Sequence, residues 1–177
     1  MKASKIIQTI SFALKICIIV SIVVNALVIL GGVIGLSETV LSENGGVVTE
    51  IVIEDILDYT DVLTASELRA ILGGTIVVAT SELLVCIFLF NYFKHELDDG
   101  TPFTFKGAKE LLFVGIKALI CFAAAMAICC FIRLIAFGNT DLSAPETDFL
   151  NVSAMGGEMI LMSLLLRFGA EEKESKE

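Results

Sequence analysis

Four charged side chains lie inside long apolar stretches of the sequence: Glu82, Lys117, Arg133 and Glu158. A charge near the centre of a bilayer costs about 2.5–3.5 kcal/mol on insertion scales, so each of them needs a physical reason. Because two are acids and two are bases, we interpret them first as two ion pairs, Glu82 with Lys117 and Arg133 with Glu158, that fix how membrane helices pack. Snorkelling toward the interface is the alternative for Arg133. The functional alternative is a proton or ion relay in which Glu82 and Glu158 titrate.

The other residue types that carry chemistry form no recognisable catalytic or metal-binding pattern. An intramembrane protease needs paired aspartates, a Ser–His dyad or zinc ligands. No Asp lies inside an apolar stretch, and His95, the single histidine, has no adjacent nucleophile. We therefore expect no enzyme, no cofactor and no metal site. The cysteines lie within the apolar stretches without a Cys-x-x-Cys pair, and we interpret them as packing residues: Cys17, Cys86, Cys121, Cys129 and Cys130.

The apolar stretches themselves predict the fold class. Of the 177 residues, 56% are hydrophobic, and they gather in blocks separated by charged segments. Blocks of about 20 apolar residues match the hydrocarbon thickness of a bilayer. We predict a single all-α membrane domain over residues 1–177, with transmembrane helices at about 16–36, 71–93, 111–137 and 150–168. The fourth is the weakest, because polar residues and glycines dilute its first half: Asn151, Ser153, Gly156, Gly157 and Glu158.

The distribution of basic residues predicts the orientation of these helices. Nine lysines and arginines flank the blocks on one side, and the other side carries only Arg69. The positive-inside rule then places the N terminus, the loop 94–110 and the C terminus in the cytoplasm. The loop 37–70 lies outside and carries an acidic stripe that we interpret as a solvated surface rather than a cation site: Glu50, Glu54, Asp58 and Asp61. The net charge of -9 argues against direct binding to nucleic acid.

Small and polar residues within the blocks predict contacts between helices. Gly31 and Gly35 have the spacing that lets a second helix approach closely. Asn25 and the neighbouring Thr80 and Ser81 are suited to hydrogen bonds between helices.

Two stretches resemble a known family. The second block ends Phe90-Asn91-Tyr92-Phe93 and leads into Leu97-Asp98-Asp99-Gly100-Thr101-Pro102-Phe103-Thr104, and the last block closes on Leu166-Arg167-Phe168-Gly169-Ala170-Glu171. The chain resembles the small bacterial four-span membrane proteins grouped as domain of unknown function 2975. The resemblance implies a bacterial cytoplasmic membrane protein without a settled activity. Because members are often encoded beside a small helix-turn-helix regulator, it also implies a membrane partner that holds or releases a transcription factor.

The middle loop is the predicted site for such a partner. Gly100 permits a turn, Pro102 stiffens it, and Phe103 and Phe105 suit the headgroup region of the membrane. An interfacial hairpin without a partner is the alternative interpretation. We predict a non-enzymatic membrane sensor or anchor that works with a helix-turn-helix regulator. The alternative function is a small transporter or channel subunit, assembled as a homo-oligomer, that uses Glu82 and Glu158.

Overall fold

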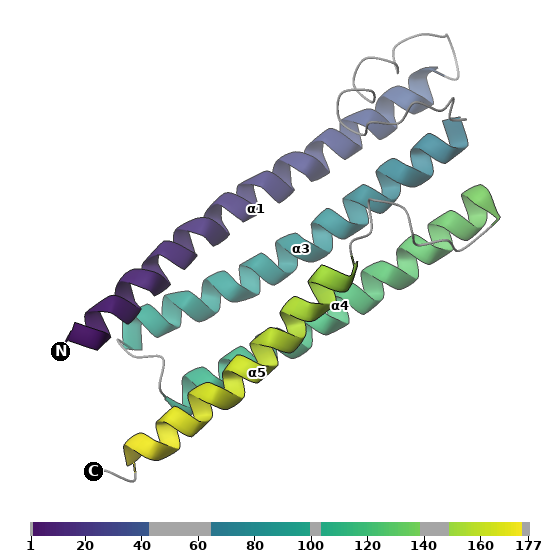
Figure 1. Ribbon diagram of the computed structural model, residues 1–177. Coiled ribbons are helices and arrows are strands. Elements are labelled where there is room, and N and C mark those ends of the chain that lie inside the picture. The colour runs from purple at the N-terminus through teal and green to yellow at the C-terminus, as the bar shows by residue number, and fades with distance from the viewer. Residues whose placement is uncertain (1, 43–64, 100–103, 139–148, 175–177) are drawn as a thin grey trace.

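The structure, a computed structural model, describes residues 2–42, 65–99, 104–138 and 149–174. These residues form four helices: α1 (Lys2–Ser42), α3 (Ala65–Asp99), α4 (Phe105–Phe137) and α5 (Phe149–Glu174) (Figure 1). The predicted all-α fold is confirmed for this part of the chain. The acidic stripe at 50–61 and the loop residues Gly100, Pro102 and Phe103 lie outside the described residues.

Three of the helices are long and apolar enough to cross a membrane. They are the segments Gln8–Ser37, Leu68–Asp98 and Phe105–Phe137, and each is longer than the block predicted from the sequence. Large apolar side chains on them face outward, as expected for helices surrounded by lipid: Ile120 and Phe131 are each 63% exposed and Ile135 is 71% exposed. Helix α5 does not meet the same criterion, so the described structure supports three apolar membrane-crossing helices.

The helices form an open row. Helix α1 packs on α3, α3 packs on α4, and α4 packs on α5, and no other pair of described helices is in contact. Successive helices run in opposite directions, so the two termini lie at the same end of the molecule (Figure 1). Helices α1 and α5 are therefore the two edges of the row, and a space is left between them.

The core lies along α4, where α3 and α5 meet it. Ala118 is fully buried, and Val114 and Phe122 bury the same face of α4. Tyr92 of α3 and Met159 of α5 belong to the same apolar cluster. Small residues at the centre of α4 allow both neighbours to approach it.

Two glycines bring α4 and α5 into backbone contact. A Cβ atom on Gly115 would lie 2.9 Å from Ile160 Cγ1 and 3.0 Å from the carbonyl oxygen of Gly156. A Cβ on Gly156 would lie 2.7 Å from Leu119 Cδ2. Gly156 therefore has a packing role. From the sequence it was interpreted only as one of the residues that make the fourth block less apolar.

The contact between α1 and α3 uses glycines that differ in part from the predicted pair. Gly35 packs against the Leu72 side chain of α3, as predicted for a contact between helices. A Cβ atom on Gly31, in contrast, would have no neighbour within 4 Å. Gly32 is the closest approach, because a Cβ there would lie 2.6 Å from Ile76 Cγ1. The predicted spacing thus found the right stretch but assigned one glycine to the wrong face of the helix.

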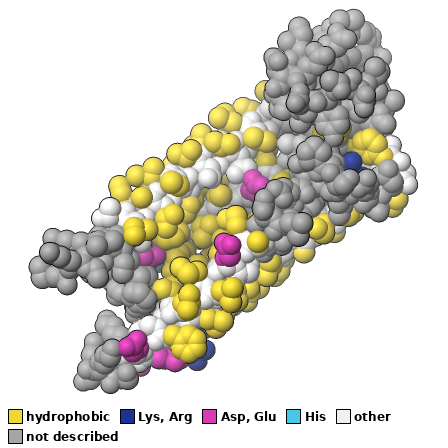
Figure 2. All heavy atoms as spheres, in the orientation of Figure 1, with side chains coloured by type: hydrophobic (Ala, Val, Ile, Leu, Met, Phe, Trp, Pro, Cys, Tyr) yellow, Lys and Arg dark blue, Asp and Glu magenta, His cyan; other side chains and the backbone are white. Residues whose placement is uncertain are grey.

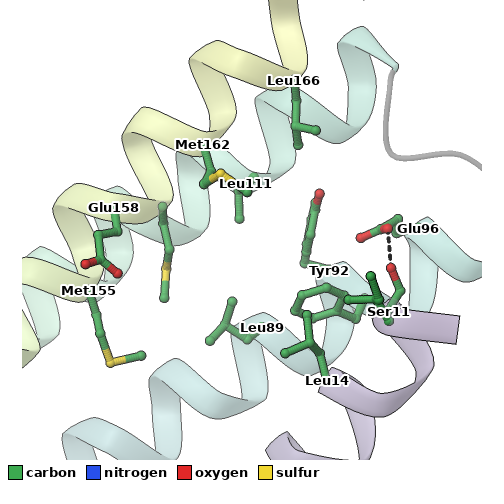
Figure 3. A pocket seen from close by; sticks show the side chains of 13 residues that line it. Ser11, Leu14, Leu89, Tyr92, Glu96, Leu111, Met155, Glu158, Met162 and Leu166 are labelled. Carbon is green, nitrogen blue, oxygen red and sulfur yellow. Dashed lines mark hydrogen bonds between the residues drawn. The ribbon is translucent and has the colours of Figure 1, made fainter. Parts of the chain in front are cut away.

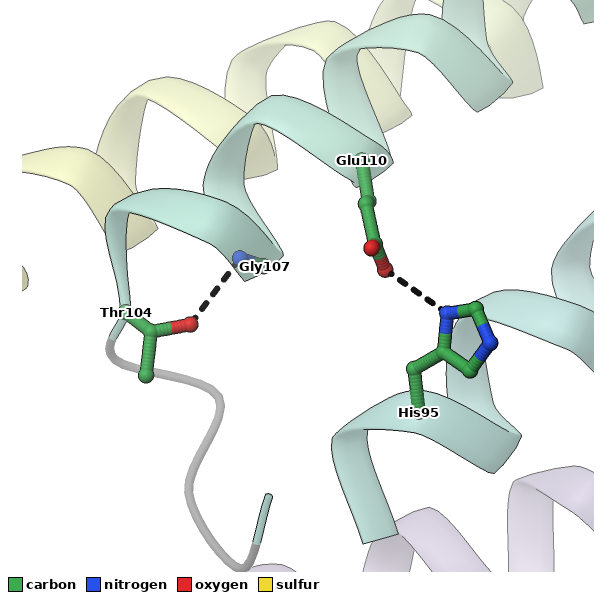
Figure 4. Close-up of polar contacts among 4 residues, drawn as sticks. All are labelled: His95, Thr104, Gly107 and Glu110. Carbon is green, nitrogen blue, oxygen red and sulfur yellow. Dashed lines mark hydrogen bonds and ion pairs between the residues drawn. The ribbon is translucent and has the colours of Figure 1, made fainter. Parts of the chain in front are cut away.

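The middle loop is shorter than predicted. Helix α3 continues to Asp99 and α4 begins at Phe105, so helix replaces most of the predicted loop 94–110. Thr104 caps α4: its side-chain oxygen accepts a hydrogen bond from the Gly107 backbone N–H at 2.9 Å (Figure 4). At the other end, Gly138 adopts a left-handed φ of 67° and its N–H donates to the Leu134 carbonyl.

Candidate functional site

Glu82 lies in α3 and faces α1 rather than α4. It lines a cleft of about 510 Å³ between these two helices together with Asn25 of α1. The Asn25 amide donates to the Ser21 carbonyl at 3.1 Å. The predicted interhelical hydrogen bond of Asn25 stays a prediction, because the bond that its amide donates remains within α1.

The other predicted interhelical hydrogen bonds do not form. The Thr80 hydroxyl donates to the Ile76 carbonyl at 2.7 Å, and the Ser81 hydroxyl donates to the Val78 carbonyl at 2.8 Å. Both bonds stay within α3. Hydroxyl side chains in helices often donate a hydrogen bond to a backbone carbonyl of the preceding turn. The sequence does not show whether they bind there or on a neighbouring helix.

Lys117 and Arg133 lie over aromatic rings. The Lys117 Nζ atom lies 4.9 Å from the centre of the Phe88 ring on α3, and the Arg133 guanidinium carbon lies 5.3 Å from the Phe137 ring on α4 itself. Such contacts stabilise a cation through the ring quadrupole. Within the described residues, neither cation forms an ion pair with Glu82 or Glu158.

The predicted ion pairs are therefore wrong, and the arrangement of helices explains why. The prediction assumed that α3 and α4 would present Glu82 and Lys117 to each other and that Arg133 would reach Glu158. Instead, Glu82 faces α1. Glu158 lines a different cleft, which lies between α1 and α5.

This second cleft lies between α1 and α5 and is floored by α3 and α4. Its volume is about 530 Å³ and most of its lining is apolar, including Met155, Met159 and Met162 of α5. Two carboxyl groups line it, Glu158 from α5 and Glu96 from α3, as Figure 3 shows. The space-filling view in Figure 2 shows acidic side chains next to the hollow between these apolar surfaces.

A polar cluster closes one end of the α1–α5 cleft. The Ser11 hydroxyl of α1 donates to Glu96 Oε1 at 2.6 Å, although the two residues are 85 positions apart in the sequence (Figure 3). Tyr92 lies beside Glu96 in the lining of the cleft (Figure 3). Ser11 and Tyr92 are 4% and 5% exposed. The cluster links α1 to α3 where the two helices leave the predicted apolar spans.

The sequence alone did not reveal this cluster. Ser11 precedes the first predicted span, and Glu96 was assigned to a loop. One signal was present, because Tyr92 and Glu96 are four residues apart and face the same side of a helix. The position of Ser11 beside them depends on the packing of α1 on α3, which no local pattern encodes.

A third polar contact joins α3 to α4 near the middle loop. His95 Nδ1 lies 3.2 Å from Glu110 Oε2 (Figure 4). Phe105, the one predicted docking residue in the described part, is the first residue of α4 and is 41% exposed. The ends of α3 and α4 that carry the loop are thus tied to each other and, through Glu96, to α1.

The remaining polar chemistry is limited. The cysteines form no disulfide: Cys129 is buried, Cys17 is exposed, and the other three are partly buried. Within the described ranges, no three His, Cys, Asp or Glu side chains form a group able to hold a metal ion.

No family model, curated protein or solved structure matches the chain. The geometry defines an α-helical protein with three helices able to cross a membrane and two clefts that each contain a carboxyl group.

Proposed function

We propose that the chain is a four-span protein of a bacterial cytoplasmic membrane with both termini in the cytoplasm. The nine basic residues that flank the predicted spans on one side support this orientation. Helix α5 supports a fourth span because it packs along α4 and presents large apolar side chains outward, among them Leu161 and Leu165. The resemblance to the domain of unknown function 2975 family agrees with this topology.

The function that the geometry supports best is a non-enzymatic membrane sensor or anchor that acts through a cytoplasmic partner. One observation carries the proposal: the middle loop joins two helix ends that are held by polar contacts. His95 binds Glu110 across α3 and α4, and Glu96 binds Ser11 of α1. A change in how α1 packs would therefore reach the base of the loop directly, as a sensor requires.

The proposed partner is a small helix-turn-helix regulator bound at this cytoplasmic end. The proposal rests on the family resemblance and on the exposed Phe105 beside the loop. Exposed aromatic side chains often anchor protein interfaces. The acidic net charge of the membrane protein makes direct contact with DNA unfavourable, so transcriptional control would pass through the partner.

The test is affinity purification of the full chain from its native cell in mild detergent, with mass spectrometry of the proteins recovered. Replacing residues 100–103 with a Gly/Ser linker of the same length is expected to lose the regulator. Glu82→Gln serves as the control and is expected to retain it. Recovery of the regulator by the linker variant at the level of the unaltered protein would refute the role of the loop.

A small oligomeric transporter or channel subunit is the second candidate, and the position of Glu82 supports it. This carboxyl group lies within a predicted span and lines a cleft beside Asn25. The candidate predicts that Glu82→Gln and Glu158→Gln abolish proton or cation flux into sealed vesicles while both variants still insert. An unaltered protein that gives no flux at several pH values would eliminate the candidate.

A further inference from the structure

The cleft between α1 and α5 combines apolar walls with carboxyl groups. It is an apolar space of about 530 Å³ at the edge of the molecule, and it contains two carboxyl groups. No Lys, Arg or His is among its described lining residues. A carboxyl group within an apolar, low-dielectric surface interacts with a cation more strongly than the same group in water.

Among the residues that the structure describes, Glu158 is the carboxyl group of this cleft without a polar partner. It is exposed into this space, and it forms no hydrogen bond or ion pair with any other described residue. Glu96 at the other end already accepts a hydrogen bond from Ser11. The two carboxyl groups therefore differ in availability, and Glu158 is the one that remains open to a ligand.

The chemistry of the lining favours an organic cation over a metal ion. A metal ion needs several oxygen, nitrogen or sulfur ligands at short distances, and within the described part of the chain no such group exists. The apolar surface around Glu158 suits a hydrophobic body instead. Met155, Met159 and Met162 are flexible side chains that adapt to ligands of different shape.

Aromatic side chains complete the site. Tyr92 and Phe93 line the same cleft, and their rings pack edge to face with centroids 5.2 Å apart. Tyr92 lies beside Glu96 (Figure 3), so these rings offer apolar surface to the hydrophobic body of a ligand whose charge lies toward Glu158. From these observations together, we propose that the α1–α5 cleft binds an amphipathic organic cation, with the hydrophobic body against the methionines and the charge beside Glu158.

This inference goes beyond the proposed function because it concerns binding alone. It requires neither a cytoplasmic partner nor transport, and it is tested on the purified protein. Loss of the regulator in the linker experiment would therefore leave it standing. Where the sensor function also holds, the cation would be its signal.

The experiment uses the full chain in nanodiscs and two ions of similar shape and opposite charge, tetraphenylphosphonium and tetraphenylborate. Equilibrium binding is measured against empty nanodiscs to subtract partition into lipid. We expect saturable binding of about one tetraphenylphosphonium per chain and no saturable binding of tetraphenylborate. Equal saturable binding of both ions, or of neither, would overturn the proposal.

Two variants locate the site. Glu158→Gln is expected to weaken tetraphenylphosphonium binding at least tenfold, because it removes the charge and keeps the shape of the side chain. Met162→Trp is expected to abolish binding by filling the cleft. The control is Glu171→Gln, which removes one negative charge from the same helix, where Glu171 pairs with Arg167 outside the cleft.

Two results would count against the cleft as the site. Undiminished binding by both cleft variants would place the cation elsewhere. Size measurements that show a stable dimer of the unaltered protein, broken by Met162→Trp, together with no cation binding, would show that a second copy fills the cleft. A gel-filtration profile like that of the unaltered protein confirms that each variant is folded.

Discussion

Helices α1 and α3 are joined differently from helices α4 and α5. Between α1 and α3, the Ser11 hydroxyl donates to Glu96 and Asn25 lies near Glu82 in the cleft, while Gly32 packs against the Ile76 side chain. Between α4 and α5, Gly115 brings the two backbones together beside Gly156. A hydrogen-bonded contact tolerates a side chain of another shape if the bond is kept, whereas a backbone contact tolerates no added atom. The α4–α5 contact should therefore be the more sensitive to an atom added at its glycines, and the α1–α3 contact the more sensitive to loss of a polar side chain.

The largest effect is expected where an atom is added to the α4–α5 contact. Gly115→Leu would place a side chain against the Gly156 carbonyl oxygen, which lies 3.0 Å from a built Cβ. Overpacking of this kind typically costs about 1–3 kcal/mol. We expect a loss of stability in this range, measured as the free energy of unfolding by SDS titration in mixed micelles.

Gly157→Leu is the matched control for that substitution. Gly157 neighbours Gly156 on α5, but a Cβ there meets nothing within 4 Å. The same residue change should then leave stability equal or slightly higher, because leucine favours helix more than glycine does. Equal destabilisation by the two leucines would show that glycine is needed for a reason other than close approach.

A smaller effect is expected where a polar side chain is removed from the α1–α3 contact. Asn25→Leu keeps the approximate volume but takes away the amide that lines the same cleft as Glu82. Hydrogen bonds between membrane helices contribute about 0.5–2 kcal/mol, and we expect a loss of about 1 kcal/mol on the same titration.

A double-mutant cycle sharpens this second prediction. Glu82→Gln retains an oxygen that can accept from Asn25, so it should cost less than Asn25→Leu. If the hydrogen bond carries the effect, the loss from Asn25→Leu should shrink when Glu82 is replaced by leucine. Strict additivity of the two leucine substitutions would mean that the pair is not energetically coupled.

These interfaces show what the sequence could predict and what it could not. Apolar blocks predicted the three long helices because a membrane span leaves a strong compositional signal. The end of α3 was predicted too early and the start of α4 too late. Polar residues such as His95 and Glu110 continue each helix beyond its apolar span. The sequence therefore located the helices but not their full lengths.

The partners of the charged residues were the part that could not be predicted. Opposite charges suggested ion pairs, but the direction that each residue faces depends on which helices are neighbours. In the row of helices, Glu82 faces Asn25 and Lys117 faces Phe88. Charge alone cannot distinguish an amide or an aromatic ring from a carboxylate as the partner. That choice requires knowledge of the tertiary contacts.

The contact between Lys117 and Phe88 allows a weaker test across the interface of α3 and α4. Lys117→Met removes the charge but keeps an unbranched side chain, and we expect a loss of about 0.5–1 kcal/mol. Lys109→Met is the control on the same helix, because Lys109 lies 6.0 Å from the Phe113 ring of α4 itself. A larger loss in the control than at Lys117 would contradict a stabilising contact between α3 and α4.

The smallest effect on stability is expected at the pair of His95 and Glu110, although this pair lies closest to the middle loop. Its side chains are 53% and 31% exposed, and solvent-screened pairs contribute about 0–1 kcal/mol at most. We expect His95→Gln to change the free energy of unfolding by less than about 0.5 kcal/mol, because glutamine can still donate to Glu110. If the pair instead serves to hold the loop, His95→Ala should weaken partner recovery while His95→Gln preserves it, with stability nearly equal in both. A parallel loss of stability and recovery would assign the pair a purely structural role, and its contribution would then resemble that of Asn25 in the α1–α3 contact.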